Sequence, residues 1–164
     1  MENNINIVAH LKKIPLFKDL SLPDLEKMAA IATYKEAVSD EFLLLERQVG
    51  EDLLVLVSGK VVIEISLPSS NELEDLCSLQ AGDVIGELSL LGIDRRSASA
   101  KVIEDATYLV FNKVALLETL SKDHSLGYRF MTRLAQILAH RIVGTTKNLG
   151  NALYQVNSTG KFAG

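Results

Sequence analysis

A change in hydrophobic periodicity constrains the fold of this chain more than any other feature of its sequence. Between Thr33 and Asn112 apolar and polar residues alternate with a period of two, whereas both flanks show the spacing of three and four residues that is typical of amphipathic helices. Roughly seven or eight short strands at this spacing indicate an antiparallel barrel, sandwich or jelly roll. The strand-like runs are Thr33–Val38, Phe42–Leu45, Leu53–Val57, Val61–Ser66, Asp75–Leu79, Ser99–Ile103 and Thr107–Phe111.

Short polar segments separate the predicted strands. Ser58-Gly59 lies between two apolar runs and predicts a tight hairpin, which would reverse the chain. Pro68-Ser69-Ser70-Asn71 predicts a loop, and Ala81-Gly82-Asp83 predicts another turn.

The flanking segments are predicted to be helical. Ser21 is expected to be the N-cap of a helix with Pro23 in its first turn. A long amphipathic helix is expected to start near Leu126. Its apolar stripe either packs on the β core or contacts a second copy of the chain through its C-terminal half, although Gly144 and Gly150 each weaken a helix interior by about 1 kcal/mol. The stripe comprises Leu134, Leu138, Ile142, Thr145, Leu149, Ala152 and Val156.

Composition limits the kinds of ligand and location. The chain has 164 residues and a formal net charge of −4, and its basic residues are scattered among acidic ones, so we expect no direct binding to DNA. No apolar run approaches the roughly 20 residues of a membrane span. The single cysteine, Cys77, cannot form an internal disulfide, and no residues have the spacing of a metal site. We therefore expect a cytoplasmic protein without a metal, in which Cys77 is a small core residue of a strand.

One short segment, residues 86–97, contains the residues that indicate a ligand-binding site. Gly86 allows the backbone to approach a ligand closely, and Glu87–Leu91 can form one helical turn whose free N–H groups favour an anion. Arg96 on the following strand offers a charge-assisted contact to the same anion, and Ser97 adds a hydroxyl donor. The carboxylate of Glu87 is an acceptor suited to a sugar hydroxyl. The segment therefore predicts a site for both a phosphate and a ribose.

This segment resembles the phosphate-binding cassette of the cyclic-nucleotide-binding domain family, in which a Gly-Glu-Leu motif precedes an arginine ten residues after its glycine, as Gly86 precedes Arg96 here. The resemblance covers nearly the whole chain. It implies a mainly β fold with flanking α, namely a double-stranded antiparallel β-roll with N-terminal helices and a long C-terminal helix. By the roles of the family, Glu87 would accept the ribose 2′-hydroxyl. The residues expected to face the cyclic phosphate are Gly86, Leu88, Arg96 and Ser97.

The two adjacent arginines of this segment are expected to differ in role. Arg96 is expected to supply the only positive charge directed at the phosphate. Its neighbour Arg95 stands where many relatives have proline, and we expect it to lie on the surface.

The long C-terminal helix resembles the dimer helix of the bacterial catabolite activator proteins. In these relatives two adjacent hydroxyl residues contact the adenine amino group, one from each subunit, and Thr145 and Thr146 would inherit those roles. The resemblance implies a parallel homodimer along this helix. It ends before any helix-turn-helix, which again implies no direct contact with DNA.

These expectations divide the chain into an N-terminal helical lead-in at residues 1–32, the β-roll with its cassette at 33–112, C-terminal helices with the dimerisation helix at 113–156, and a tail at 157–164. The expected function is a sensor module that binds a cyclic nucleotide, with cAMP favoured and cGMP as the other candidate ligand. A scaffold that dimerises or binds proteins without a ligand is the alternative. We do not expect an enzyme, because hydrolysis of the nucleotide needs metal ligands or an activated nucleophile. The downstream protein partner is not identified by the sequence.

Overall fold

Two long strands, β3 (Asp52–Ser66) and β6 (Ser99–Asn112), pair antiparallel over most of their length and form the centre of the β-roll. The computed structural model describes the backbone of residues 2–67 and 72–159 and the side chains of residues 7–67 and 72–156. In this part of the chain the sheet has six strands in the order β1-β6-β3-β4, with β2 added to β6 and β5 added to β3. The remaining elements are α1 (Glu2–Leu11), η1 (Pro15–Phe17), α2 (Leu22–Ala30), β1 (Ala32–Ala37), β2 (Phe42–Leu44), β4 (Leu73–Gln80), β5 (Val84–Ile85), η2 (Glu87–Leu91), α3 (Lys113–Lys122) and α4 (His124–Thr159).

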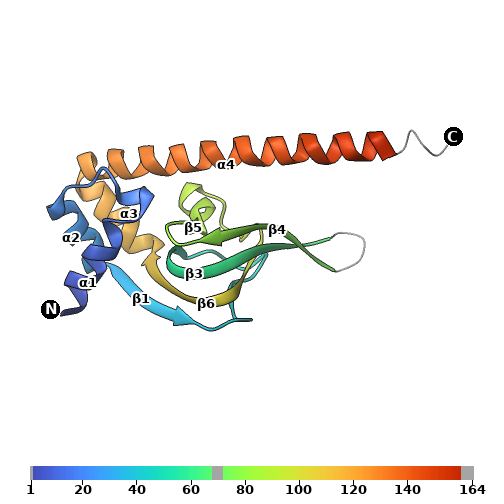
Figure 1. Cartoon of the computed structure of the whole chain (residues 1–164). Helices are drawn as coiled ribbons and strands as arrows, with labels where there is room; N and C mark the ends of the chain where they lie inside the picture. The colour runs from blue at the N-terminus through green and yellow to red at the C-terminus, as the bar shows by residue number, and fades with distance from the viewer. Residues whose placement is uncertain (1, 68–71, 160–164) are drawn as a thin grey trace.

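The predicted fold class is confirmed. An antiparallel sheet lies between short N-terminal helices and a long C-terminal helix, and α4 runs along one side of the roll with its C-terminal end projecting past it (Figure 1). The seven predicted runs become six strands, because four of them merge in pairs into β3 and β6, while the two-residue strand β5 was not predicted.

The hairpin predicted at Ser58-Gly59 is wrong. β3 continues through both residues, with Leu56 opposite Tyr108 before the glycine and Lys60 opposite Glu104 after it. The register shifts around Ser58, and Gly59 has a φ of +84°, so the strand bends without reversing. A β-carbon at Gly59 would overlap the carbonyl oxygen of Asp105, which explains why a glycine is needed at this bend.

The N-terminal helices pack on the start of α4. Ser21 is the N-cap of α2, as predicted, and its hydroxyl and backbone form a capping box with Asp24. Asp24 also accepts from Arg129 Nη2 of α4 at 2.6 Å, and only 6% of its side chain is exposed. This ion pair ties α4 to α2.

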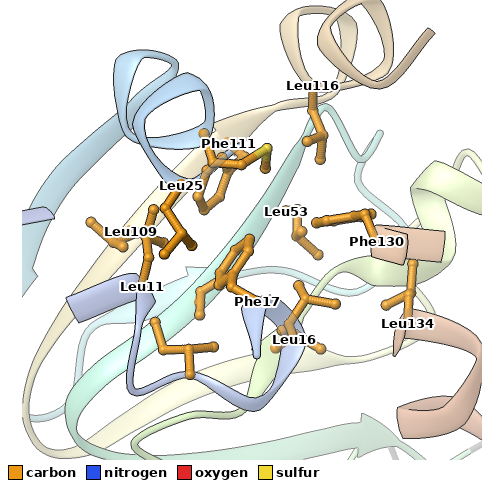
Figure 2. Packing of buried hydrophobic residues seen from close by; sticks show 14 of the residues in the cluster. Leu11, Leu16, Phe17, Leu25, Leu53, Leu109, Phe111, Leu116, Phe130 and Leu134 are labelled. Carbon is orange, nitrogen blue, oxygen red and sulfur yellow. The ribbon is translucent and has the colours of Figure 1, made fainter. Parts of the chain in front are cut away.

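The first third of α4 belongs to the core between the helices and the roll. Phe17 lies between the rings of Phe111 and Phe130, with ring centroids 5.7 and 6.0 Å apart. Leu134 is also buried in this cluster, and Figure 2 shows it beside Leu16 and Phe130. A second buried cluster fills the roll itself. It comprises Ala37, Leu54, Leu56, Val61, Leu79, Ile85, Ala100, Val102 and Ala106.

The apolar stripe of α4 therefore divides into two parts. Leu134 is 1% exposed and Leu138 packs against the same cluster, so neither residue is available as the surface of the expected dimer. From Ile142 onward the apolar side chains are exposed, including Leu149 and Val156. Among the described residues, the exposed part of the apolar stripe is therefore confined to the second part of the helix.

The two ends of α4 also differ from expectation. The helix begins at His124, two residues before Leu126, and ends at Thr159, beyond the expected end at residue 156. Residues 160–164 of the expected tail, and the predicted loop at residues 68–71, lie outside the described residues.

Candidate functional site

A cavity of about 420 Å³ opens between α4, β4 and the segment that joins β5 to β6. Its volume lies within the range of about 300 to 1,000 Å³ that is typical of small-molecule sites. Six of the seven predicted site residues line it, namely Gly86, Glu87, Leu88, Arg96, Ser97 and Thr145. The structure thus brings together predicted residues from η2 and its N-cap, from the segment before β6, and from α4.

Gly86 and Arg96 are held together by close backbone packing. Gly86 has a φ of +80° at the N-cap of η2, a conformation that favours glycine. The Arg96 guanidinium donates from Nη1 to the Gly86 carbonyl at 3.1 Å and from Nη2 to the Asp52 carbonyl at 2.8 Å. A β-carbon at Gly86 would overlap Arg96 Nη1 and would stand 2.9 Å from the Asp52 oxygen. The glycine therefore makes room for the guanidinium.

Arg96 is a buried cation whose partners are neutral. It is 8% exposed, and among the described residues no carboxylate lies within ion-pair distance of it. Burial lowers the pKa of the Arg96 guanidinium, although the nearby carboxylates of Asp52 and Glu87 act in the opposite direction. An arginine stays protonated at neutral pH despite such a shift. The cavity wall therefore holds a desolvated positive charge that is compensated mainly by carbonyl dipoles.

Glu87 is paired with a residue that the sequence analysis missed. Arg141 of α4 donates from Nη1 to Glu87 Oε1 at 2.7 Å and from Nη2 to the Val84 carbonyl at 2.6 Å. Its Nη2 also lies 4.0 Å from Asp83 Oδ1. Because Arg141 is four residues before Thr145, both lie on one face of the helix, so the assignment of Thr145 could have revealed it.

The adjacent threonines of α4 point in different directions. Thr145 lines the cavity, whereas Thr146 is exposed outside it and donates its hydroxyl to the Ile142 carbonyl at 2.9 Å. The role expected of Thr146 is in the site of a second subunit, so it stays a prediction.

The expectation that Cys77 is a core residue is wrong. Cys77 is exposed and lines the cavity, because it lies on β4, an edge strand of the sheet in which only Leu79 is buried. Burial against the cavity wall nevertheless raises the pKa of the Cys77 thiol. Arg95 and Arg141 line the same cavity as Arg96, so the expectation that Arg96 alone is directed at the phosphate stays a prediction. Arg95 is exposed, as expected, and donates to the Arg47 carbonyl at 2.9 Å.

The charges around the cavity sum to one positive charge. Three arginines (Arg95, Arg96 and Arg141) face two carboxylates (Asp83 and Glu87). Since Arg141 and Glu87 pair with each other, the uncompensated charge lies at the end where Arg95 and Arg96 are adjacent. This arrangement suits a ligand with one anionic group at that end and hydroxyl groups near Glu87.

Comparison with known proteins agrees with this geometry. A family model described as the cyclic nucleotide-binding domain matches residues 34–123, which is more than half of the chain. The chain belongs to the cyclic nucleotide-binding domain family. Among curated proteins it is 35% identical over 120 residues to the anaerobic regulatory protein of Bacillus subtilis, covering 71% of this chain and 50% of that protein. It is 28% identical over 145 residues to the cGMP-dependent protein kinase egl-4 of Caenorhabditis elegans, covering 84% of this chain and 18% of the kinase. The domain thus spans half or less of these relatives.

Solved structures share the fold over most of the chain. A cyclic nucleotide-binding domain from Methylobacillus flagellatus has a TM-score of 0.80 and 26% identity, covering 92% of this chain and 84% of that one. The catabolite activator protein of Thermus thermophilus has a TM-score of 0.72 and 24% identity, covering 85% of this chain and 63% of that one. The expected resemblance to sensor domains of this kind is confirmed.

Other kinds of site were sought in the same part of the chain. No described helix is long and apolar enough to cross a membrane. No group of three or more His, Cys, Asp or Glu side chains in the described ranges is arranged to hold a metal ion.

Proposed function

We propose that this domain is a sensor that binds a 3′,5′-cyclic nucleotide in the cavity under α4, favours cAMP, and reports occupancy through α4. The observation that carries the proposal is the buried guanidinium of Arg96, which lines the cavity and has only carbonyl partners. Burying a charge without a counter-charge is costly, so an anion that enters the cavity gains the interaction that the protein itself does not supply.

The neighbouring groups support a nucleotide as the source of that anion. Glu87 and Arg141 lie beside the phosphate end of the cavity, where a ribose hydroxyl can donate to the carboxylate. Thr145 faces the cavity from α4 and can bond the base. The net charge of one around the cavity matches the single negative charge of a cyclic phosphodiester.

The choice of cAMP rests on the hydroxyls of Ser97 and Thr145, together with Thr146 of a partner subunit. Both nucleotides occur among the related proteins. Curated relatives include cGMP-dependent kinases, whereas the regulatory domain of a Toxoplasma gondii kinase, which shares the fold, was crystallised with cAMP. Direct competition between the two nucleotides is therefore part of the test.

Calorimetric titration of the purified domain with cAMP and with cGMP tests the proposal. Removing a charge-assisted contact from a desolvated site costs about 2–5 kcal/mol, so Arg96→Ala should weaken binding by about 30-fold to several thousand-fold. Arg133→Ala is the matched control, because Arg133 is outside this cavity and pairs with Asp19.

Two results would overturn the proposal at different levels. If the parent binds neither nucleotide, or if Arg96→Ala binds as tightly as the parent, the assignment of the cavity fails. If the parent prefers cGMP, the phosphate site stands and the base preference is wrong.

We also propose that the second part of α4 forms a parallel homodimer. Ile142, Leu149 and Val156 recur every seven residues and are 66%, 59% and 68% exposed, which is the spacing of a coiled-coil seam. Leu149→Glu should produce a monomer in light scattering at micromolar concentration. Lys147→Glu, which introduces an acid on another face of the helix, should leave the dimer intact. A monomeric parent, with and without nucleotide, would contradict the dimer.

The exposed stripe also defines the second candidate function, a dimerisation or protein-interaction scaffold that needs no ligand. Arg96 argues against it, because a scaffold has no use for a buried cation at a cavity. We place the domain in the cytoplasm, where the unpaired Cys77 would stay reduced, and we propose a binding role without catalysis or direct DNA contact.

A further inference from the structure

Asn148 is a cavity residue that none of the assigned contacts uses. It lies on α4 at seven residues after Arg141 and three after Thr145, so the three side chains share one face of the helix. All three line the cavity. Among the described residues nothing donates to the Asn148 amide or accepts from it.

The position of Asn148 along α4 places it at the far end of the cavity from the phosphate site. An α-helix rises 1.5 Å per residue, so Asn148 lies about 10 Å beyond Arg141 along the helix axis. Arg141 marks the ribose end through its contact with Glu87. The wall opposite α4 includes Cys77 and Ser78 of β4. A nucleotide that is held by its phosphate and ribose would extend its base into this part of the cavity.

Gly144 leaves space for a flat base beside the helix. It lines the cavity between Arg141 and Thr145, and a β-carbon built on it meets no atom within 4 Å. Glycine is unfavourable relative to alanine in a helix interior, which makes its place at the cavity notable. The base can therefore approach the helix backbone at Gly144 and present its edge to Asn148.

We infer that Asn148 determines base specificity by bonding the Watson–Crick edge of the purine, an inference that rests on the proposed nucleotide site. The amide oxygen can accept from the adenine amino group while the amide nitrogen donates to the adjacent ring nitrogen. A threonine hydroxyl rotates to donate or accept, so Thr145 discriminates less between bases. Asparagine at this position can satisfy adenine with two directed bonds.

Replacing the amide by a carboxylate tests the inference, because a carboxylate only accepts. The guanine edge offers two neighbouring donors, a ring N–H and an amino group, whereas the adenine edge offers one donor beside an acceptor. Asn148→Asp should therefore shift the ratio of the dissociation constants for cAMP and cGMP at least about tenfold toward cGMP. Asn148→Ala should weaken cAMP binding without creating a preference for cGMP.

Asn151→Asp is the matched control. Asn151 is exposed on the same helix one turn further on and does not line the cavity, so this variant adds the same charge without facing the base. It should leave the ratio unchanged. If the parent binds but Asn148→Asp keeps the parental ratio, or shifts it toward cAMP, the inference is wrong and the nucleotide site stands. If the parent binds neither nucleotide, the proposed function itself fails.

Discussion

The ion pair between Arg141 and Glu87 should couple α4 to the β-roll by an amount that can be measured without any ligand. Breaking a buried pair by removing one partner costs about 3–5 kcal/mol, because the remaining charge stays buried. The side chains of Arg141 and Glu87 are 30% and 11% exposed, so water compensates part of this loss. We expect Arg141→Gln to lower the free energy of unfolding by about 1–3 kcal/mol.

A double-mutant cycle isolates the pair from other effects. Glu87→Gln alone should also destabilise the domain, whereas Arg141→Gln with Glu87→Gln should cost less than the sum of the two, because neither charge is then left alone. Urea denaturation of the four proteins at pH 7 measures these free energies. Arg133→Gln is the control and should cost at most about 1 kcal/mol, since its partner Asp19 is half exposed. Strictly additive losses at Arg141 and Glu87 would refute the coupling.

Three further predictions concern stability and the cavity thiol. Arg47 has a φ of +68°, so Arg47→Gly should stabilise the domain by about 0.5–1 kcal/mol in denaturation, and a loss of stability would contradict the strain. Burial raises the pKa of Asp24, but hydrogen bonds from Ser21 and Arg129 outweigh it and hold the pKa below the ordinary 3.8. The ionised Asp24 therefore stabilises the folded domain above pH 3.8, and this stabilisation is lost as the pH falls through the lowered pKa. Asp24→Asn should therefore cost about 1–3 kcal/mol at pH 7, and denaturation measured against pH should show this difference shrinking below pH 3.8; a constant difference would argue against the charge. Burial raises the pKa of Cys77 above the ordinary 9.0, so the rate of maleimide labelling should still rise about tenfold per pH unit up to pH 9, and cAMP should slow the labelling. A rate that levels off at lower pH, or that does not respond to the nucleotide, would contradict the position of the thiol at the cavity.

The sequence predicted that Gly86 and Arg96 would lie together, because the geometry that joins them is local. Gly86 and Arg96 are ten residues apart, and both residue types and their spacing are visible in the chain, although Arg96 lies in the segment before β6 and not on the strand that was expected. Arg141 and Asn148 share a helix face with Thr145, so their spacing from it could have revealed them once that face was known to line the cavity, whereas the place where α4 crosses the roll is not encoded by spacing.

The errors in the fold have a similar cause. A glycine after a serine looks the same in a hairpin and in a strand bend, and the difference at Gly59 lies in β6, whose carbonyl at Asp105 approaches the glycine from the opposite strand. The apolar period of α4 does not reveal which of its residues meet the chain's own core, so Leu134 could not be separated from Ile142 before Phe17 and Phe130 were placed.

Because α4 is one continuous helix, a rotation of the part that docks on the roll would move the whole of its free end. The docked segment ends near Arg141, and the 18 residues from Ile142 to Thr159 extend about 27 Å beyond it at 1.5 Å per residue. A change of about 5° in the docking angle would displace the tip of the helix by about 2 Å. Under the proposed sensor role, a small change in how α4 docks on the roll would therefore move most the far end of the helix, which projects past the rest of the domain (Figure 1).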